Sequence, residues 1–291
     1  KEFGPLQRSM DDQEPWLGET GSVRTFTGLK PVLIRFFELG FSRLSFRETV
    51  GGFQMPVLLS QALMSVFYSA NISAIAYPVL TLAAARVLQS FGTEEQRLKY
   101  LEPMLEGRFY GTMALTEPQA GSSLADICTK ATPDGKGAYH LQGSKIFISG
   151  GDQDLSENII HLVLAREEGL AAGIAGLSLF IVPKFMVGGD GQVGEVNGVS
   201  LTGLIHKMGY RGTTSTLLSF GEQTPCTGYR IGEAGRGLFY MFQMMNEARI
   251  VVGTGAASLA CSSFSLARSY AEERLQGRAF SSRGSEIPQV P

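Results

Sequence analysis

One stretch in the middle of the chain decides the fold: Gly111-Thr112-Met113-Ala114-Leu115-Thr116-Glu117-Pro118-Gln119-Ala120-Gly121-Ser122-Ser123. The apolar run from Met113 to Leu115 predicts a buried strand that stops at a hydroxyl residue, Thr116. Pro118 cannot continue a central strand, and Gly121 permits a tight bend. Free N–H groups and hydroxyls at such a bend can bind a polar, planar ligand without any charged side chain. An ordinary Pro/Gly turn is the alternative.

Composition and charge place the chain among globular proteins. Of its 291 residues, 44% are hydrophobic and 18% are charged, which allows a sizeable core. The formal net charge is -2 and the Lys and Arg residues are scattered, so neither nucleic acid nor an anionic membrane is an expected partner. No unbroken run of about 20 apolar residues predicts a membrane span. No signal peptide is visible.

The cysteines and histidines predict no metal site. Cys128, Cys226 and Cys261 lie far apart, and the three histidines are isolated from one another. An odd number of cysteines is typical of a reducing compartment, so we expect a cytoplasmic protein. The sequence also contains no P-loop and no GxSxG motif.

Changes in composition divide the chain into four segments. Residues 1–30 are polar and predict an extended arm, and residues 31–109 predict an N-terminal helical domain. Residues 110–228 predict an all-β domain, either a sandwich or a barrel. Residues 229–291 predict the first long helix of an incomplete C-terminal helical domain. The fold class is therefore α+β. Because the chain begins without Met and ends after a polar loop, we expect a piece of a longer protein.

Helical patterns occur on both sides of the β segment. Residues 54–107 show helical spacing, and Pro78 predicts that the second helix starts or kinks there. Thr93-Glu94-Glu95-Gln96 has the pattern of a capping box. Residues 237–276 contain no proline and would form a helix about 60 Å long. Such a helix is too long for one small domain to cover.

Short β-rich runs separated by turn residues predict the strands. Residues 138–141 and 145–149 flank Gln142-Gly143, which predicts a hairpin, with Asp134-Gly135-Lys136-Gly137 as the turn before it. Further strands are predicted at residues 159–165, 177–182, 199–206 and 215–220.

A glycine-rich stretch at residues 249–258 superficially matches a dinucleotide-binding loop. That fingerprint needs a following helix, a second strand and an acidic residue about 20 positions further on. Here helical periodicity continues through the glycines from both sides, and a polar loop follows Gln276. We therefore interpret the stretch as part of the long helix.

Four segments, in order, resemble the acyl-CoA dehydrogenase family. They are residues 113–122, Lys145-Ile146-Phe147-Ile148-Ser149, Lys207-Met208-Gly209-Tyr210-Arg211-Gly212-Thr213 and Ala271-Glu272-Glu273-Arg274-Leu275-Gln276-Gly277-Arg278. Order and spacing match from about residue 40 to the end. The segments at residues 150–152, 157–161 and 182–185 most resemble a larger bacterial subgroup that includes the 3-methylmercaptopropionyl-CoA dehydrogenases.

The resemblance implies FAD in a cleft between the β domain and the C-terminal helices. Thr116 would bond the flavin near N5 and O4, Ser122 would serve the pyrophosphate, and Phe147 with Ser149 would cover the other face of the ring. The residues implied to contact FAD are Met113, Ala114, Leu115, Thr116, Gly121, Ser122, Phe147, Ile148 and Ser149, with Arg274 and Gln276 reaching the FAD of a neighbouring subunit. Ser122, Asn246 and Arg249 are implied to bind acyl-CoA.

The implied reaction is α,β-dehydrogenation of an acyl-CoA thioester. A carboxylate removes the α-proton while the β-hydrogen passes as hydride to flavin N5. Electrons would then pass to an electron-transfer flavoprotein, and the enzyme would be a homodimer or homotetramer. The length of acyl chain would depend on a pocket near residues 63–76 and 239–245.

Two departures from the family pattern qualify this expectation. Ser123 stands where the family usually has Asp, and no catalytic base is found. Some members have the base Glu directly before the position of Arg249, where this chain has Ala248. Glu247 is one residue away, about 100° around the helix. We therefore expect no catalytic residue in this chain and a base Glu beyond Pro291.

Two other functions remain open. A flavin oxidase or flavin monooxygenase on the same scaffold would share these motifs. A non-catalytic, truncated member that acts in binding would explain the missing base, as in the DNA-associated flavoproteins of this fold. The net negative charge of the chain disfavours binding to DNA.

Overall fold

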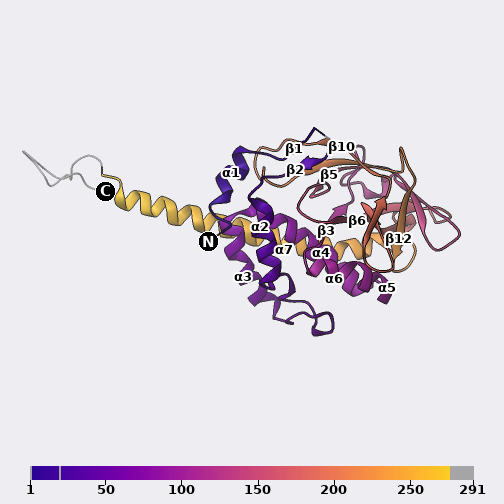
Figure 1. Cartoon of the computed structure of the whole chain (residues 1–291), viewed down its shortest axis with the longest axis horizontal. Helices are drawn as coiled ribbons and strands as arrows, with labels where there is room; N and C mark the ends of the chain where they lie inside the picture. Colours follow the sequence, from indigo (N-terminus) through magenta and orange to yellow (C-terminus); the bar gives the residue numbers. More distant parts are fainter. Residues whose placement is uncertain (1, 20, 276–291) are drawn as a thin grey trace, which may run out of the picture.

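The computed structural model describes residues 2–19 and 21–275, which form a helical region, a β region and one long helix (Figure 1). Helices and short strands come first in the chain. Their bounds are α1 Leu6–Asp12, β1 Trp16–Leu17, β2 Val23–Arg24, α2 Leu29–Glu38, α3 Val57–Ala70, α4 Ile72–Phe91, α5 Glu94–Gln96 and α6 Glu102–Leu105. A π-helical turn, Arg97–Leu101, joins α5 to α6.

The N-terminal residues are not the extended polar arm that the sequence predicts. The described part contains α1 and the β1–β2 pair, and Met10 of α1 is fully buried. Phe3, Met10 and Leu29 belong to one hydrophobic cluster with Tyr68 of α3 and Tyr110 of β3. These apolar residues show no helical or strand periodicity along the chain, so only their tertiary contacts place them in the core.

Helix α4 is the central helix of the N-terminal region. It begins at Ile72 because the Asn71 side chain accepts a hydrogen bond from the Ala74 N–H at 3.0 Å. The helix continues through Pro78, so the predicted start at that proline is wrong. The predicted capping box at α5 is confirmed, because the Thr93 and Gln96 side chains each accept a backbone N–H of the other at 3.1 Å.

The middle of the chain forms a single eight-stranded sheet and a small hairpin. The strands are β3 Phe109–Ala114, β4 Lys130–Pro133, β5 Tyr139–Ser149, β6 Asn158–Glu167, β7 Leu177–Pro183, β8 Phe185–Val187, β9 Val193–Val196, β10 Val199–Leu204, β11 Ser215–Phe220 and β12 Cys226–Ile231. The sheet order is β10-β11-β5-β12-β7-β6-β3, and β4 pairs with both β5 and β6. The strands predicted at residues 159–165, 177–182, 199–206 and 215–220 are confirmed as β6, β7, β10 and β11.

The hairpin predicted at Gln142-Gly143 is wrong. Both residues lie within the continuous strand β5, and the hairpin turn falls between β4 and β5 instead. There the Asp134 carboxylate accepts the N–H groups of Lys136 at 2.7 Å and Ala138 at 3.0 Å. Gly143 allows the backbone of β5 to lie close to Thr129, because a Cβ added to Gly143 would lie 2.7 Å from the Cα of Thr129.

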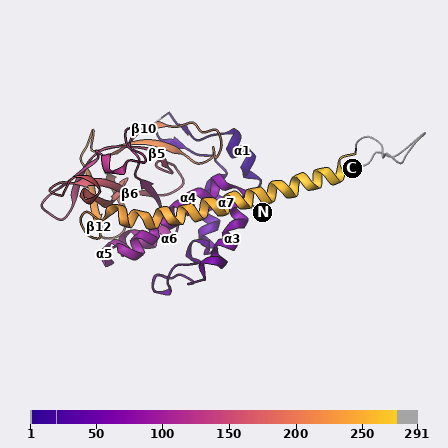
Figure 2. The ribbon, with the colours of Figure 1, turned by 180° about the vertical axis from the view of Figure 1, so that it is seen from behind.

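The long helix is α7, Gly237–Glu273. Its first half runs antiparallel to α4: Gln243 bonds Ser90, and Gly255 lies against Ile72. Its second half leaves the body of the molecule (Figures 1 and 2), and its apolar residues there, such as Phe264 and Leu266, are exposed. By length and hydropathy alone, both α4 and α7 could cross a membrane, although α4 is mostly buried within the protein.

Candidate functional site

The bend after β3 is held against β5 by its backbone. The Thr116 carbonyl accepts the N–H of Ile146 at 2.9 Å, which places Thr116 beside the predicted flavin strand. Glu117 and Ala120 then exchange two backbone hydrogen bonds, of 2.9 and 3.0 Å. This tight loop brings Gly121 close to Thr116. A Cβ added to Gly121 would lie 3.8 Å from the methyl carbon of Thr116.

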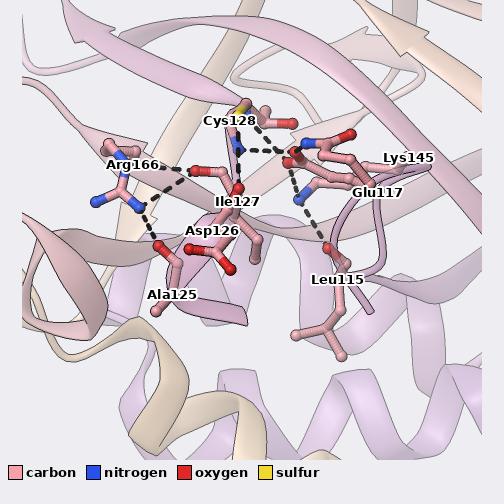
Figure 3. Close-up of polar contacts among 10 residues, drawn as sticks. Leu115, Glu117, Ala125, Asp126, Ile127, Cys128, Lys145 and Arg166 are labelled. Carbon is pink, nitrogen blue, oxygen red and sulfur yellow. Dashed lines mark hydrogen bonds and ion pairs between the residues drawn. The ribbon is translucent and has the colours of Figure 1, made fainter. Parts of the chain in front are cut away.

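A buried ion pair lies beneath this loop (Figure 3). The Lys145 Nζ donates to Glu117 Oε1 at 2.8 Å and to the Leu115 carbonyl at 2.9 Å, and both charged side chains are buried. The same carboxylate accepts the N–H groups of Cys128 at 2.7 Å and Thr129 at 2.9 Å. One glutamate therefore joins the end of β3, the start of β4 and the strand β5.

Both members of the pair are charged at neutral pH. Burial would raise the pKa of Glu117, but the Lys145 ammonium and the donated hydrogen bonds outweigh burial and lower that pKa to about 2. Burial lowers the pKa of Lys145 to about 8, and the attraction of Glu117 opposes this. The hydrogen bonds of this buried pair favour one geometry, so they hold the inner side of the loop in place.

Arg166 holds the next turn of the loop (Figure 3). Its guanidinium donates to the carbonyls of Ala125 at 2.7 Å, Ile127 at 3.2 Å and Gly173 at 3.1 Å. Ala125 lies in a short 3₁₀ turn, Leu124–Asp126, which Ile127 follows, and Gly173 begins a second one, Gly173–Gly176. The segment from Thr116 to Thr129 is therefore fixed at both ends.

The outer side of the bend is open. Phe147 has a φ of 60° and is 59% exposed, an unusual state for a large aromatic residue inside a strand. Among the described residues, no hydrogen bond is made by the hydroxyls of Thr116 and Ser122. Phe147 therefore offers an exposed ring, and the Thr116 and Ser122 hydroxyls are free to bond a ligand as far as the described residues go.

The predicted flavin residues differ in how exposed they are. Thr116 and Ser149 are half-buried, whereas Gly121, Ser122 and Phe147 are exposed and open to a ligand. The side chains of Ala114, Leu115 and Ile148 are buried in the protein core, so only their backbone atoms can contact a cofactor. Met113 is half-buried and lines the adjacent cavity.

An apolar cavity of about 270 Å³ lies between α3, α4 and α7. Met64, Tyr68 and Met244 line it, in the two ranges where the sequence places the acyl pocket. Asn246 and Arg249, the predicted substrate residues, do not line it. They are exposed on α7 and bonded to each other, Arg249 Nη1 to Asn246 Oδ1 at 2.7 Å. Their side chains can meet a ligand only outside this cavity.

Comparison with known proteins decides the family. Residues 17–108 match the N-terminal domain of acyl-CoA dehydrogenases, and residues 112–222 match the middle domain. The chain belongs to the acyl-CoA dehydrogenase family. It is 39% identical to 3-methylmercaptopropionyl-CoA dehydrogenase of Ruegeria pomeroyi over 95% of this chain and 46% of that protein. It is 38% identical to a butyryl-CoA dehydrogenase of Syntrophomonas wolfei over 90% of this chain and 44% of that protein.

Solved acyl-CoA dehydrogenase structures share the fold. Butyryl-CoA dehydrogenase of Megasphaera elsdenii superposes with a TM-score of 0.76 at 24% identity, over 97% of this chain and 67% of that one. The acyl-CoA dehydrogenase of Geobacillus kaustophilus gives 0.75 at 24% identity, over 99% and 68%. The predicted order of a helical domain, a β domain and a long helix is therefore confirmed. The chain spans less than half the length of the curated relatives named above.

The acyl-CoA dehydrogenase motif at the end of α7 is only partly described. Arg274 is the residue that caps α7, and its N–H donates to the Tyr270 carbonyl at 2.9 Å. The predicted cofactor residue Gln276 lies outside the described residues. Within the described part of the chain, no three His, Cys, Asp or Glu side chains gather into a metal site.

Sequence reasoning set Glu247 aside as a base and missed Arg86, its partner in the cavity. Glu247 lines it, and its carboxylate lies 3.0 Å from Nε of Arg86. Burial raises the pKa of Glu247 to about 7, although Arg86 opposes the shift. The sequence shows the glutamate but gives no sign of its partner, because Arg86 lies on a different helix.

Proposed function

We propose that this chain supplies the FAD-facing wall and the acyl cavity of an enzyme that α,β-dehydrogenates acyl-CoA thioesters. The observation that carries the proposal is the open edge formed by Thr116 and Phe147, beside a cavity that Met113 also lines. FAD, when bound, would accept the hydride. Thr116 and Ser122 would orient it through their hydroxyls, and the Glu117–Lys145 pair would hold them in place.

The apolar walls of the cavity fit the acyl part of the substrate. Residues such as Leu44, Met64 and Val251 exclude water, which strengthens any hydrogen bond made to a thioester carbonyl. Ala248 lines the cavity at the position where some family members have the base. We therefore propose that the carboxylate that removes the α-proton comes from outside this chain, and we propose no catalytic residue within it.

We also propose the partners of this enzyme: the acyl-CoA substrate, an electron acceptor and further copies of the same chain. Acyl-CoA dehydrogenases named among the relatives act on acyl-CoA thioesters, and electron-transfer flavoprotein is the electron acceptor that we propose. A homodimer or homotetramer would cover the exposed half of α7.

The test has two parts. FAD is titrated into the chain, and the quenching of flavin fluorescence measures its dissociation constant. Thr116→Val should weaken FAD binding by about 10-fold. The variant loses one hydrogen bond between uncharged groups, and with it the orientation that this bond gives the cofactor. Thr132→Val, at an exposed position of β4, is the matched control and should bind FAD like the unaltered chain. Equal binding by both variants would contradict the role of Thr116.

The second part addresses the reaction. The chain joined to its natural continuation should be yellow, and an acyl-CoA should bleach the flavin without oxygen. An intact FAD complex that no acyl-CoA reduces would refute the dehydrogenase. Rapid reoxidation of the reduced flavin by O₂ would favour the oxidase or monooxygenase instead.

A further inference from the structure

The loop between β10 and β11, residues 205–214, is bonded directly to the predicted flavin strand. Ser215, which follows this loop, pairs with Ser149 of β5, and the Thr214 carbonyl accepts the Gly150 N–H at 3.1 Å. Ser149 is one of the residues expected beside the flavin ring. A shift of the 205–214 loop would therefore move the end of β5, because backbone hydrogen bonds join the two segments.

Helix α4 holds the end of the 205–214 loop. The Thr213 hydroxyl donates to the Ser73 carbonyl at 2.7 Å, and the Tyr77 hydroxyl accepts the Thr214 N–H at 3.0 Å. All four residues are buried. These bonds fix the last two residues of the loop, whereas its charged side chains bond to a different part of the molecule.

The N-terminal segment holds those charged side chains. Glu14 lies between α1 and β1, and its carboxylate accepts a hydrogen bond from Arg211 Nε at 2.6 Å. The same carboxylate lies 2.9 Å from Nδ1 of His206. Met10 of α1 also packs on the loop, because a Cβ added to Gly212 would lie 2.6 Å from the Met10 methyl carbon. The segment before β1 is therefore packed directly on the 205–214 loop.

The same N-terminal segment also contacts the loop that follows β5. Asp154, four residues after Gly150, accepts the N–H of Thr25 at 3.1 Å and the Thr25 hydroxyl at 2.6 Å. Arg24 of β2 lies 3.6 Å from this carboxylate. Residues 14–25 therefore bridge the loop before β11 and the loop after β5, and these two loops are bonded to each other at Gly150.

We propose that Glu14 is a positioning residue for the cofactor, which acts through Arg211 on the end of β5. The inference rests on the proposed function, since FAD is the ligand expected beside that end. Arg211 is half-buried, and among the described residues its guanidinium pairs with no carboxylate other than that of Glu14. Without this carboxylate the arginine is free to turn toward water, and the loop samples more than one arrangement. A ligand that needs one arrangement then binds more weakly.

Cofactor binding is the first readout. FAD is titrated into the chain carrying Glu14→Ala, and the quenching of flavin fluorescence gives the dissociation constant. We expect binding to weaken by about 5-fold. The control is Asp12→Ala, which removes an acidic residue of the same segment that pairs with Arg8 at an exposed position. This control should bind FAD like the unaltered chain.

Reversal of the charges distinguishes the pair from its separate members. Glu14→Arg and Arg211→Glu should each weaken FAD binding by about 5-fold or more, because like charges then face each other. The double variant Glu14→Arg/Arg211→Glu should restore binding to within about 2-fold of the unaltered chain. A double variant that binds as weakly as the single variants would overturn the proposal.

Hydrogen exchange of the chain without FAD shows where the effect of Glu14→Ala lies. Amide hydrogens in residues 149–151 and 205–215 should exchange faster than in the unaltered chain, whereas those of β6 and β7 should keep their protection. Faster exchange throughout the sheet would indicate a loss of global stability and would overturn the positioning role.

The outcomes separate the two proposals. If the unaltered chain binds no FAD, the proposed function fails and the inference about Glu14 fails with it. If the unaltered chain binds FAD and Glu14→Ala binds it equally well, only the role of Glu14 is refuted.

Discussion

At the scale of single residues, the Glu117–Lys145 pair decides the geometry of the candidate site. It connects three strands beneath the bend, and both side chains are almost completely buried. A buried pair is not by itself strong stabilisation, because removing both charges from water is costly. Its effect here is to select one arrangement of the loop, since both carboxylate oxygens of Glu117 accept hydrogen bonds and the Lys145 ammonium donates two.

Lys145→Met should destabilise the chain by about 3–5 kcal/mol, because it leaves the Glu117 carboxylate buried without its cation. Chemical denaturation monitored by circular dichroism measures the free energy of unfolding. Lys136→Met is the control, since Lys136 is exposed in the β4–β5 turn and should change stability by less than about 0.5 kcal/mol. A loss as small as that of the control would show that the pair does not hold the loop.

The same carboxylate predicts a pH dependence. The pKa of Glu117 is about 2 in the folded chain and near its ordinary value of 4.5 when unfolded, so its contribution is present above pH 4.5. That contribution is lost as the pH falls from 4.5 toward 2. The unfolding free energy of Glu117→Gln should therefore depend less on pH in this window than that of the unaltered chain. Parallel pH profiles would contradict the prediction.

At the scale of elements, the contact between α4 and β3 positions the bend. Gly111 permits it, because a Cβ there would lie 2.6 Å from the Ala84 Cβ and 3.2 Å from the Thr81 Cα. The Thr81 hydroxyl also accepts the Gly111 N–H at 3.0 Å. The strand that ends at the candidate site is therefore packed directly on the central helix.

Gly111→Ala should destabilise the chain by about 1–3 kcal/mol, because α4 and β3 must move apart to admit the methyl group. It should also weaken FAD binding, since the bend moves with β3. Gly203→Ala, in β10, is the control, because a Cβ there meets no atom within 4 Å. Equal melting temperatures for the two variants would argue against close α4–β3 packing.

At the scale of the whole molecule, α7 joins a packed half to an exposed half. Residues up to Gly255 contact α3 and α4, whereas apolar residues further along, such as Phe264, Leu266 and Tyr270, are exposed (Figure 2). An isolated helix with an exposed apolar surface has few contacts that resist local opening.

Amide hydrogens in residues 260–273 should exchange much faster than those of α4 in the isolated chain. Hydrogen exchange followed by mass spectrometry measures this. Protection that increases with protein concentration would indicate that a second copy covers the exposed half. Protection equal to that of α4 in dilute solution would contradict the exposed position of this segment.

The sequence by itself determined the helical and β regions, the strands at regular spacing, the capping box and the family, because each of these depends on residues close together in the chain. It also located the bend at Thr116. Only the tertiary structure decided the rest. It buried Met10, placed Gly143 inside a continuous strand, excluded Asn246 and Arg249 from the cavity and brought Arg86 to Glu247. Those outcomes depend on contacts between distant segments, and no local periodicity encodes which side chains will meet when two helices pack antiparallel.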